Sequence, residues 1–213
     1  MLPALKKNIS SMEIPKQHIN SAAKTSIYAL NHYAMAISGR LCSVDGEVNL
    51  TEKKSFLQLF PYFKHDQLGM FKDCANDNNS VYLSCKRFCK FSNNDPKIAG
   101  KLYGRLFKLA TSDSTLNVYE ISFLEKIISM LGLPNILLDK ALEYYFLDDL
   151  KHPGGLFASK KKVKNFYRSQ ISKLHPDSFH GAGALTERTR KVIMSLANER
   201  VKILNENYRK SFS

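Results

Sequence analysis

The tripeptide His175-Pro176-Asp177 places an imidazole and a carboxylate where the backbone must turn. Pro176 has no N–H and disfavours helical geometry at the residue before it, so a helix should end at His175. Gly181 and Gly183 add helix breakers to the segment that follows. No nucleophile–base signature or phosphate-binding loop occurs in the chain. We therefore expect a loop that presents His175 and Asp177 for binding, and a protein that is not an enzyme.

Two stretches with helical periodicity flank this loop and must position it. Their apolar residues recur mostly at steps of three and four, which is typical of one buried helix face. The upstream stretch contains Val163, Phe166, Tyr167, Ile171 and Leu174, and the downstream stretch contains Ile193, Leu196, Ala197, Val201, Leu204 and Tyr208. The pattern predicts an antiparallel helical hairpin over residues 160–213, with the tripeptide near its tip.

The hairpin resembles a J domain, the module with which DnaJ-type co-chaperones stimulate DnaK. Tyr-Arg at residues 167–168 precedes the tripeptide and Asn-Glu-x-Tyr at residues 205–208 follows it, in the order that the family shows. The long loop through residues 183–187 is similar to the DjlA branch of the family. Residues 143–147 either are similar to the opening J-domain helix or end the preceding bundle. The chain departs from the family at Ser178, where a lysine is usual.

The resemblance implies that His175, Pro176 and Asp177 contact a DnaK-family chaperone and trigger its ATP hydrolysis. Asp177 would then pair with a basic residue of DnaK. The first helix is strongly basic and would suit an acidic surface, although a run of lysines can also be a solvated helix face. The basic residues expected to bind the partner are Lys161, Lys162, Lys164, Arg168 and Lys173. Unfolded or specific client proteins are the other expected partners.

The N-terminal region contains an internal repeat, in which residues 41–52 align with residues 109–120. Each copy joins two apolar helical stretches and carries two carboxylates: Asp45 and Glu52 in the first, Asp113 and Glu120 in the second. Asn49 and Asn117 stand three residues before the glutamates, the spacing of a helix capping box. The alternative is a weak divalent-metal site, because part of each copy resembles an EF-hand loop; the other ligand positions of that loop are missing.

The repeated pattern is also similar to a TerB-type domain, a helical fold that precedes a C-terminal J domain in DjlA-like proteins. TerB domains have been linked to acidic metal-binding clusters, which the resemblance extends to these four carboxylates. We expect an all-α protein with an N-terminal extension over residues 1–20, a TerB-like helical bundle over 21–150, a linker over 151–159, and the J-like hairpin. The alternative is a TerB-like stress-response or scaffold protein with a degenerate J-like tail.

Composition and charge limit the classes of partner that the sequence leads us to expect. An apolar content of 44% suits a globular protein, and the formal charge of +13 implies attraction to an acidic partner. No base-reading motif is recognisable, so a nucleic acid is not expected. The first 16 residues lack the apolar core of a signal peptide, and four scattered cysteines suit reduced thiols. We expect a cytoplasmic protein without a membrane-spanning segment or a cofactor.

Overall fold

The computed structural model describes residues 21–46, 48–76, 81–113, 116–148, 168 and 185–210. Every regular element within these ranges is a helix, which confirms the predicted all-α class. The elements are α2 (Ser21–Cys42), α3 (Leu50–Leu59), the 3₁₀ helix η1 (His65–Gln67), α4 (Leu68–Asn76), α5 (Val81–Phe91), α6 (Pro96–Ala110), α7 (Val118–Met130), α8 (Ile136–Leu147) and α10 (Glu187–Lys210).

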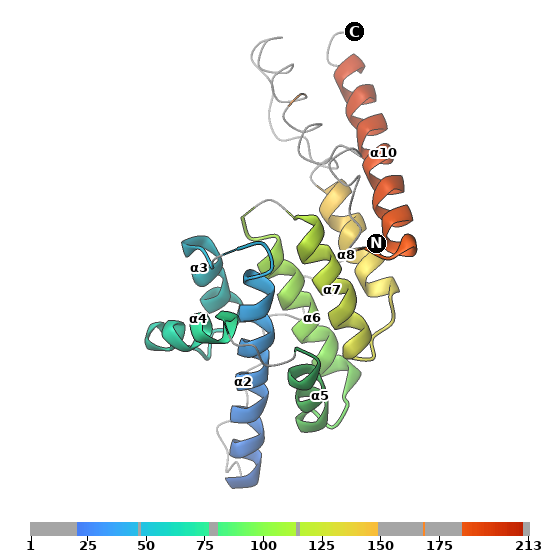
Figure 1. Ribbon diagram of the computed structural model, residues 1–213. Coiled ribbons are helices and arrows are strands. Elements are labelled where there is room, and N and C mark those ends of the chain that lie inside the picture. Colours follow the sequence, from blue (N-terminus) through green and yellow to red (C-terminus); the bar gives the residue numbers. More distant parts are fainter. Residues whose placement is uncertain are drawn as a thin grey trace.

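The two predicted helix–loop–helix units are present as α2–α3 and α6–α7, and they pack against each other (Figure 1). Helix α6 lies against α2, α3 and α7, so both copies of the repeat share one apolar interior. Many of the residues that the periodicity placed on buried faces are in this core, among them Ala34, Ile37, Leu41, Phe56, Phe60, Leu102, Leu106, Leu109, Leu124, Ile127 and Leu131. Each such side chain that is fully buried stabilises the folded state by about 1.5–3 kcal/mol.

Helix α6 begins at a capped turn. Asp95 is the N-cap of α6, where its carboxylate accepts a hydrogen bond from the Lys97 N–H at 2.8 Å. Pro96 occupies the first turn, where the missing N–H costs nothing because that group has no intrahelical acceptor. The turn before the cap carries left-handed backbone at Asn93 and Asn94, a conformation that asparagine tolerates better than most residues.

Helices α4 and α5 lie between α3 and α6 in the sequence, and so between the two helix–loop–helix units. Both pack on α2 (Figure 1), and α4 lies against the side of α2 that carries Gly39. A Cβ atom at Gly39 would lie 2.9 Å from the carbonyl oxygen of Phe71 and from the nitrogen of Ala75. The absence of a side chain at Gly39 is therefore what allows α2 and α4 to approach so closely.

The C-terminal helix α10 packs along α8 and extends beyond the bundle (Figure 1). Leu185, Ile193 and Ala197 belong to the same apolar cluster as the core of the bundle. The second helix of the predicted hairpin thus shares its buried face with the N-terminal region. The predicted linker, residues 151–159, and the predicted extension, residues 1–20, lie outside the described residues.

The four cysteines are all within the described part of the chain, and none forms a disulfide. Burial raises the pKa of the Cys85 thiol to about 12, so this side chain stays protonated and packs as a small apolar group. Of the helices described, none combines the length and the apolar character that crossing a bilayer requires.

Candidate functional site

The predicted partner-binding loop, His175, Pro176 and Asp177, lies outside the described residues, as do Lys161, Lys162, Lys164 and Lys173. Arg168 is described, and it is helical and exposed. The prediction that this loop binds a chaperone therefore rests on the sequence. What the structure adds is the position of α10, which follows the loop and carries the Asn-Glu-x-Tyr residues 205–208.

One face of α10 is buried against the bundle, and it is the face that the periodicity predicted. Ile193, Ala197 and Leu204 are buried, whereas Leu196, Val201 and Tyr208 are partly exposed. Two polar residues lie on the same buried face, Thr189 at 0% exposure and Arg200 at 2%. A buried arginine must have hydrogen-bond acceptors to offset the loss of its hydration, so Arg200 has a definite structural role.

Arg200 joins α10 to the end of α8. Its Nη1 group donates a hydrogen bond to the carbonyl oxygen of Phe146, in the last turn of α8. The carbonyls of a last helical turn have no intrahelical donor and carry partial negative charge. Arg200 therefore donates to a carbonyl of the last turn of α8, and it fixes the middle of α10 on the bundle.

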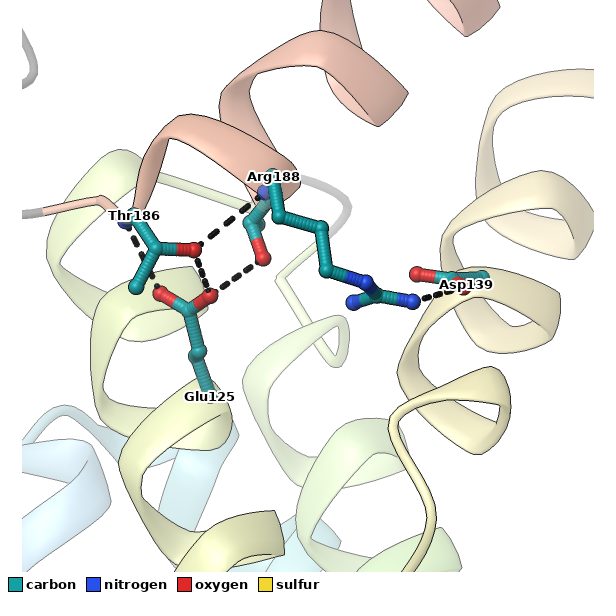
Figure 2. A network of polar contacts seen from close by, with 5 residues as sticks. Glu125, Asp139, Thr186 and Arg188 are labelled. Atoms are coloured by element: carbon teal, nitrogen blue, oxygen red, sulfur yellow. Dashed lines mark hydrogen bonds and ion pairs between the residues drawn. The ribbon is translucent and has the colours of Figure 1, made fainter.

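The start of α10 is held by a second set of polar contacts (Figure 2). The Glu125 carboxylate on α7 accepts hydrogen bonds from the Thr186 N–H at 3.2 Å and from the hydroxyl groups of Thr186 and Thr189. Two residues after Thr186, the Arg188 guanidinium reaches across to the Asp139 carboxylate on α8. Two carboxylates of the bundle thus anchor the first turn of α10, and the anion at its N-terminus also suits the helix dipole.

The four carboxylates of the repeat lie where the two helix–loop–helix units meet. Both predicted capping boxes are present, which confirms the capping role of the glutamates. The Asn49 N–H donates to Glu52 at 2.7 Å, and the Asn117 N–H donates to Glu120 at 2.9 Å. The asparagine oxygens accept in return from the backbone N–H groups of the glutamates. Each box satisfies two groups at a helix start that would otherwise lack partners.

A hydrogen bond ties one copy of the repeat to the other. The Asn117 side chain, at the start of α7, donates from Nδ2 to Asp45 Oδ2 at 2.8 Å. Asp45 lies in the turn between α2 and α3, so the loop of the first copy is linked to the cap of the second. The two capping boxes therefore form one acidic cluster, which we define as Asp45, Glu52, Asp113 and Glu120.

Burial and nearby negative charges raise the pKa of the two glutamates in this acidic cluster. Burial raises the pKa of Glu120 to about 8, and the charges of Asp45, Asp113 and Glu52 add to the rise, against the opposing hydrogen bond from the Asn117 backbone. Burial also raises the pKa of Glu52, with a further contribution from Asp45. Glu120 is 4% exposed, so water screens these interactions poorly.

The prediction that these carboxylates bind a divalent metal stays a prediction. Within the described residues, no group of three or more His, Cys, Asp or Glu side chains has an arrangement that could hold a metal ion. The geometry explains this result, because Glu52 and Glu120 accept hydrogen bonds from their caps and Asp45 accepts one from Asn117. A metal ion would have to compete with these contacts for the same oxygens.

The residues that fix α10 were not among the predicted site residues. Arg200 follows Ala197 by three positions and precedes Leu204 by four, and Thr189 precedes Ile193 by four. A polar residue in register with an apolar helical stripe is the signal that could have identified both. Nothing in the sequence pattern pairs Glu125 with Thr186, because the contact joins residues 61 positions apart.

Comparisons of the chain with protein-family models, with curated proteins and with solved structures each found no match. Its function must therefore be inferred from its own residues and their arrangement.

Proposed function

We propose that this protein is a cytoplasmic DnaJ-type co-chaperone. Its His175-Pro176-Asp177 loop docks on a DnaK-family chaperone and stimulates the chaperone's ATPase, and the helical bundle is the adaptor or regulatory module that receives client proteins. The protein carries out no reaction of its own in this proposal, because the hydrolysis takes place in the partner. The relation of the bundle to TerB-type domains and of the C-terminal region to J domains is part of the same proposal.

The observation that carries the proposal is the His175-Pro176-Asp177 motif together with the stretches of chain on both sides of it. The tripeptide lies between a basic stretch with helical periodicity and α10, whose last turns carry the Asn-Glu-x-Tyr residues 205–208. The apolar stripe of α10 is buried on the bundle and its exposed residues include Lys191, Lys202 and Arg209. A hairpin in which α10 is the second helix would be held by that contact in one orientation relative to the bundle.

The distribution of charge supports an acidic partner for the C-terminal region. Residues 149–213 contain 14 Lys and Arg and 5 Asp and Glu, so most of the formal charge of +13 belongs to this part of the chain. Such a surface increases the association rate with an acidic protein and makes it sensitive to salt. We therefore expect the stimulation of DnaK to weaken as the salt concentration rises.

The test is the ATPase activity of a DnaK-family chaperone in single-turnover assays with the full chain. We expect stimulation by the native chain and its reduction by about tenfold or more in His175→Gln, because the loss of a central contact costs about 2 kcal/mol of binding. His180→Gln is the matched control, since it makes the same change in the same loop five residues away. No stimulation by the native chain, or an equal loss in both variants, would refute the proposal.

A second candidate function is that of a TerB-like scaffold or stress-response protein that binds a divalent cation and whose C-terminal tail does not act on DnaK. The observation that favours it is the meeting of four carboxylates at the junction of the repeats. Calorimetry with calcium and other divalent ions tests it. Binding that is lost in the double variant Asp45→Ala/Asp113→Ala and kept in the exposed-site control Asp66→Ala supports this function, and no heat of binding eliminates it.

A further inference from the structure

A small cavity of about 70 Å³ lies between α2, α4 and α5. Its polar wall comes from two helices that pack side by side (Figure 1). Helix α2 contributes His32, Tyr33 and Arg40, and α5 contributes Ser84 and Arg87. The co-chaperone proposal uses none of these residues, and the cavity is separate from the acidic cluster and from the contacts of α10.

The residues around this cavity make it a cationic site. Two guanidinium groups line it, together with an imidazole and the hydroxyl-bearing residues Tyr33 and Ser84, and none of its lining residues carries a carboxylate. His32 and Arg87 stand at its solvent-exposed edge and Arg40 is half-buried, and positive charges from two facing helices favour an anion between them. The chemistry of the wall therefore calls for a negatively charged ligand.

Arg40 is held in place at the wall of the cavity. Its Nη1 donates to the carbonyl oxygen of Ala75, in the last turn of α4, at 2.9 Å. Its Nε atom is closed off from solvent, so a ligand in the cavity would meet Arg40 through the charge and the Nη atoms of its guanidinium group.

Arg87 completes the arrangement from the opposite helix. Its guanidinium carbon lies 5.9 Å from the centre of the Tyr33 ring, so the planar group is placed over an aromatic face. The Tyr33 ring itself stacks on Phe91, with 5.9 Å between the ring centres. This support limits the motion of the Arg87 side chain and reduces the entropy that ligand binding would cost.

We propose that this cavity binds a phosphate group. The group is either free inorganic phosphate or the phosphate of a small monoester. Arginine presents planar pairs of N–H donors that match phosphate oxygens, and a phosphate with close to two negative charges balances two guanidinium groups. About 70 Å³ is open to the centre of a water-sized sphere, where one water molecule needs about 10–15 Å³, so a small tetrahedral anion fits.

The test is calorimetry on the full chain at constant ionic strength, with inorganic phosphate, phenyl phosphate, acetate and chloride as separate ligands. We expect phosphate to bind more tightly than acetate or chloride, and its affinity to fall at least about tenfold in Arg87→Gln, the loss of a charge-assisted hydrogen-bond pair. Lys86→Gln removes the same charge from an exposed position next along α5 that does not line the cavity, and it should leave the affinity unchanged.

Ser84→Ala is a second variant that removes one hydroxyl donor without changing the charge, and a smaller loss of affinity is expected. Phenyl phosphate that binds far more tightly than inorganic phosphate identifies an organic monoester as the ligand, and equal affinities identify free phosphate. The proposal is overturned if neither phosphate binds more tightly than acetate, or if Lys86→Gln weakens binding as much as Arg87→Gln.

Discussion

Glu120 should make this protein less stable as the pH rises from 5 to 8. The side chain is 4% exposed, and its pKa is raised from 4.5 to about 8 by burial first and then by the charges of Asp45, Asp113 and Glu52. In the unfolded chain the same carboxyl group ionises near its ordinary value. Between these two pKa values the folded state holds a proton that the unfolded state has released.

The sign and the size of the effect follow from this difference. A group whose pKa is higher in the folded state contributes stability that is complete below the unfolded pKa and is lost as the pH rises through the folded one. Each unit of pKa difference corresponds to 1.36 kcal/mol, so the interval from pH 5 to pH 8 should remove about 3 kcal/mol from the free energy of unfolding. Glu52, whose pKa is also raised, adds to the effect in the same direction.

Glu120→Gln isolates the contribution of this residue. A glutamine at the third helical position can still accept the hydrogen bond from the Asn117 N–H, so the capping box survives while the titrating group is removed. We expect the variant to resemble the native chain at pH 5 and to be more stable than it at pH 8 by about 3 kcal/mol. The two proteins are compared at each pH, so that pH effects common to both cancel.

The assay is urea unfolding at pH 5, 6, 7 and 8 in the presence of a metal chelator. The chain has no tryptophan, so unfolding is followed by the helical circular dichroism signal. Glu143→Gln makes the same change at an exposed position on α8 and should retain the native pH dependence. The reasoning would be refuted if Glu120→Gln lost stability between pH 5 and pH 8 as steeply as the native chain, or if Glu143→Gln flattened the profile equally.

Two further stability measurements test the packing of α10 and of α2. Arg200→Ala should lower the free energy of unfolding by about 3 kcal/mol, because it removes the hydrogen bond to the Phe146 carbonyl and empties a buried position. Arg188→Ala removes a partly exposed ion pair with Asp139 and should cost about 1 kcal/mol or less. Equal losses in the two variants would show that Arg200 does not anchor α10. Gly39→Ala should destabilise the protein by about 1–3 kcal/mol, because its Cβ would lie 2.9 Å from the backbone of α4. Gly104→Ala, whose Cβ would meet open space on a helix, should stabilise it by about 0.5–1 kcal/mol. If thermal unfolding ranks the two variants the other way, α2 and α4 do not approach as closely as described.

The parts of the fold that could be predicted are those with long and regular patterns. The repeat predicted α2, α3, α6 and α7, because each has an apolar stripe. It also predicted both capping boxes, because an Asn–Glu pair at fixed spacing stands at the start of α3 and of α7. Helices α4 and α5 escaped prediction because each is short and buries few residues, such as Phe71 in α4 and Phe88 in α5. Their helical state depends on packing against α2, which no local pattern reports.

The candidate site was predictable in its residue types and not in its contacts. The spacing of Asn117 and Glu120 identified a helix cap, but the bond from Asn117 to Asp45 spans 72 positions and depends on how the two repeats meet. The contacts around the cationic cavity could not be predicted from the sequence either. His32, Arg40 and Arg87 look like ordinary surface residues in the sequence, and only the packing of α5 on α2 brings them together.

The placement of α10 changes how the C-terminal region should be viewed. A hairpin that buried its apolar residues only between its own two helices could be detached from the bundle without loss. In this protein Leu185, Ile193 and Ala197 of the C-terminal region belong to the core of the bundle, and Arg200 satisfies a carbonyl of α8. A fragment of residues 149–213 would expose this face to water. The contacts of Glu125, Asp139 and the Phe146 carbonyl fix α10 at its first turn and at its middle, so α10 should unfold together with α7 and α8.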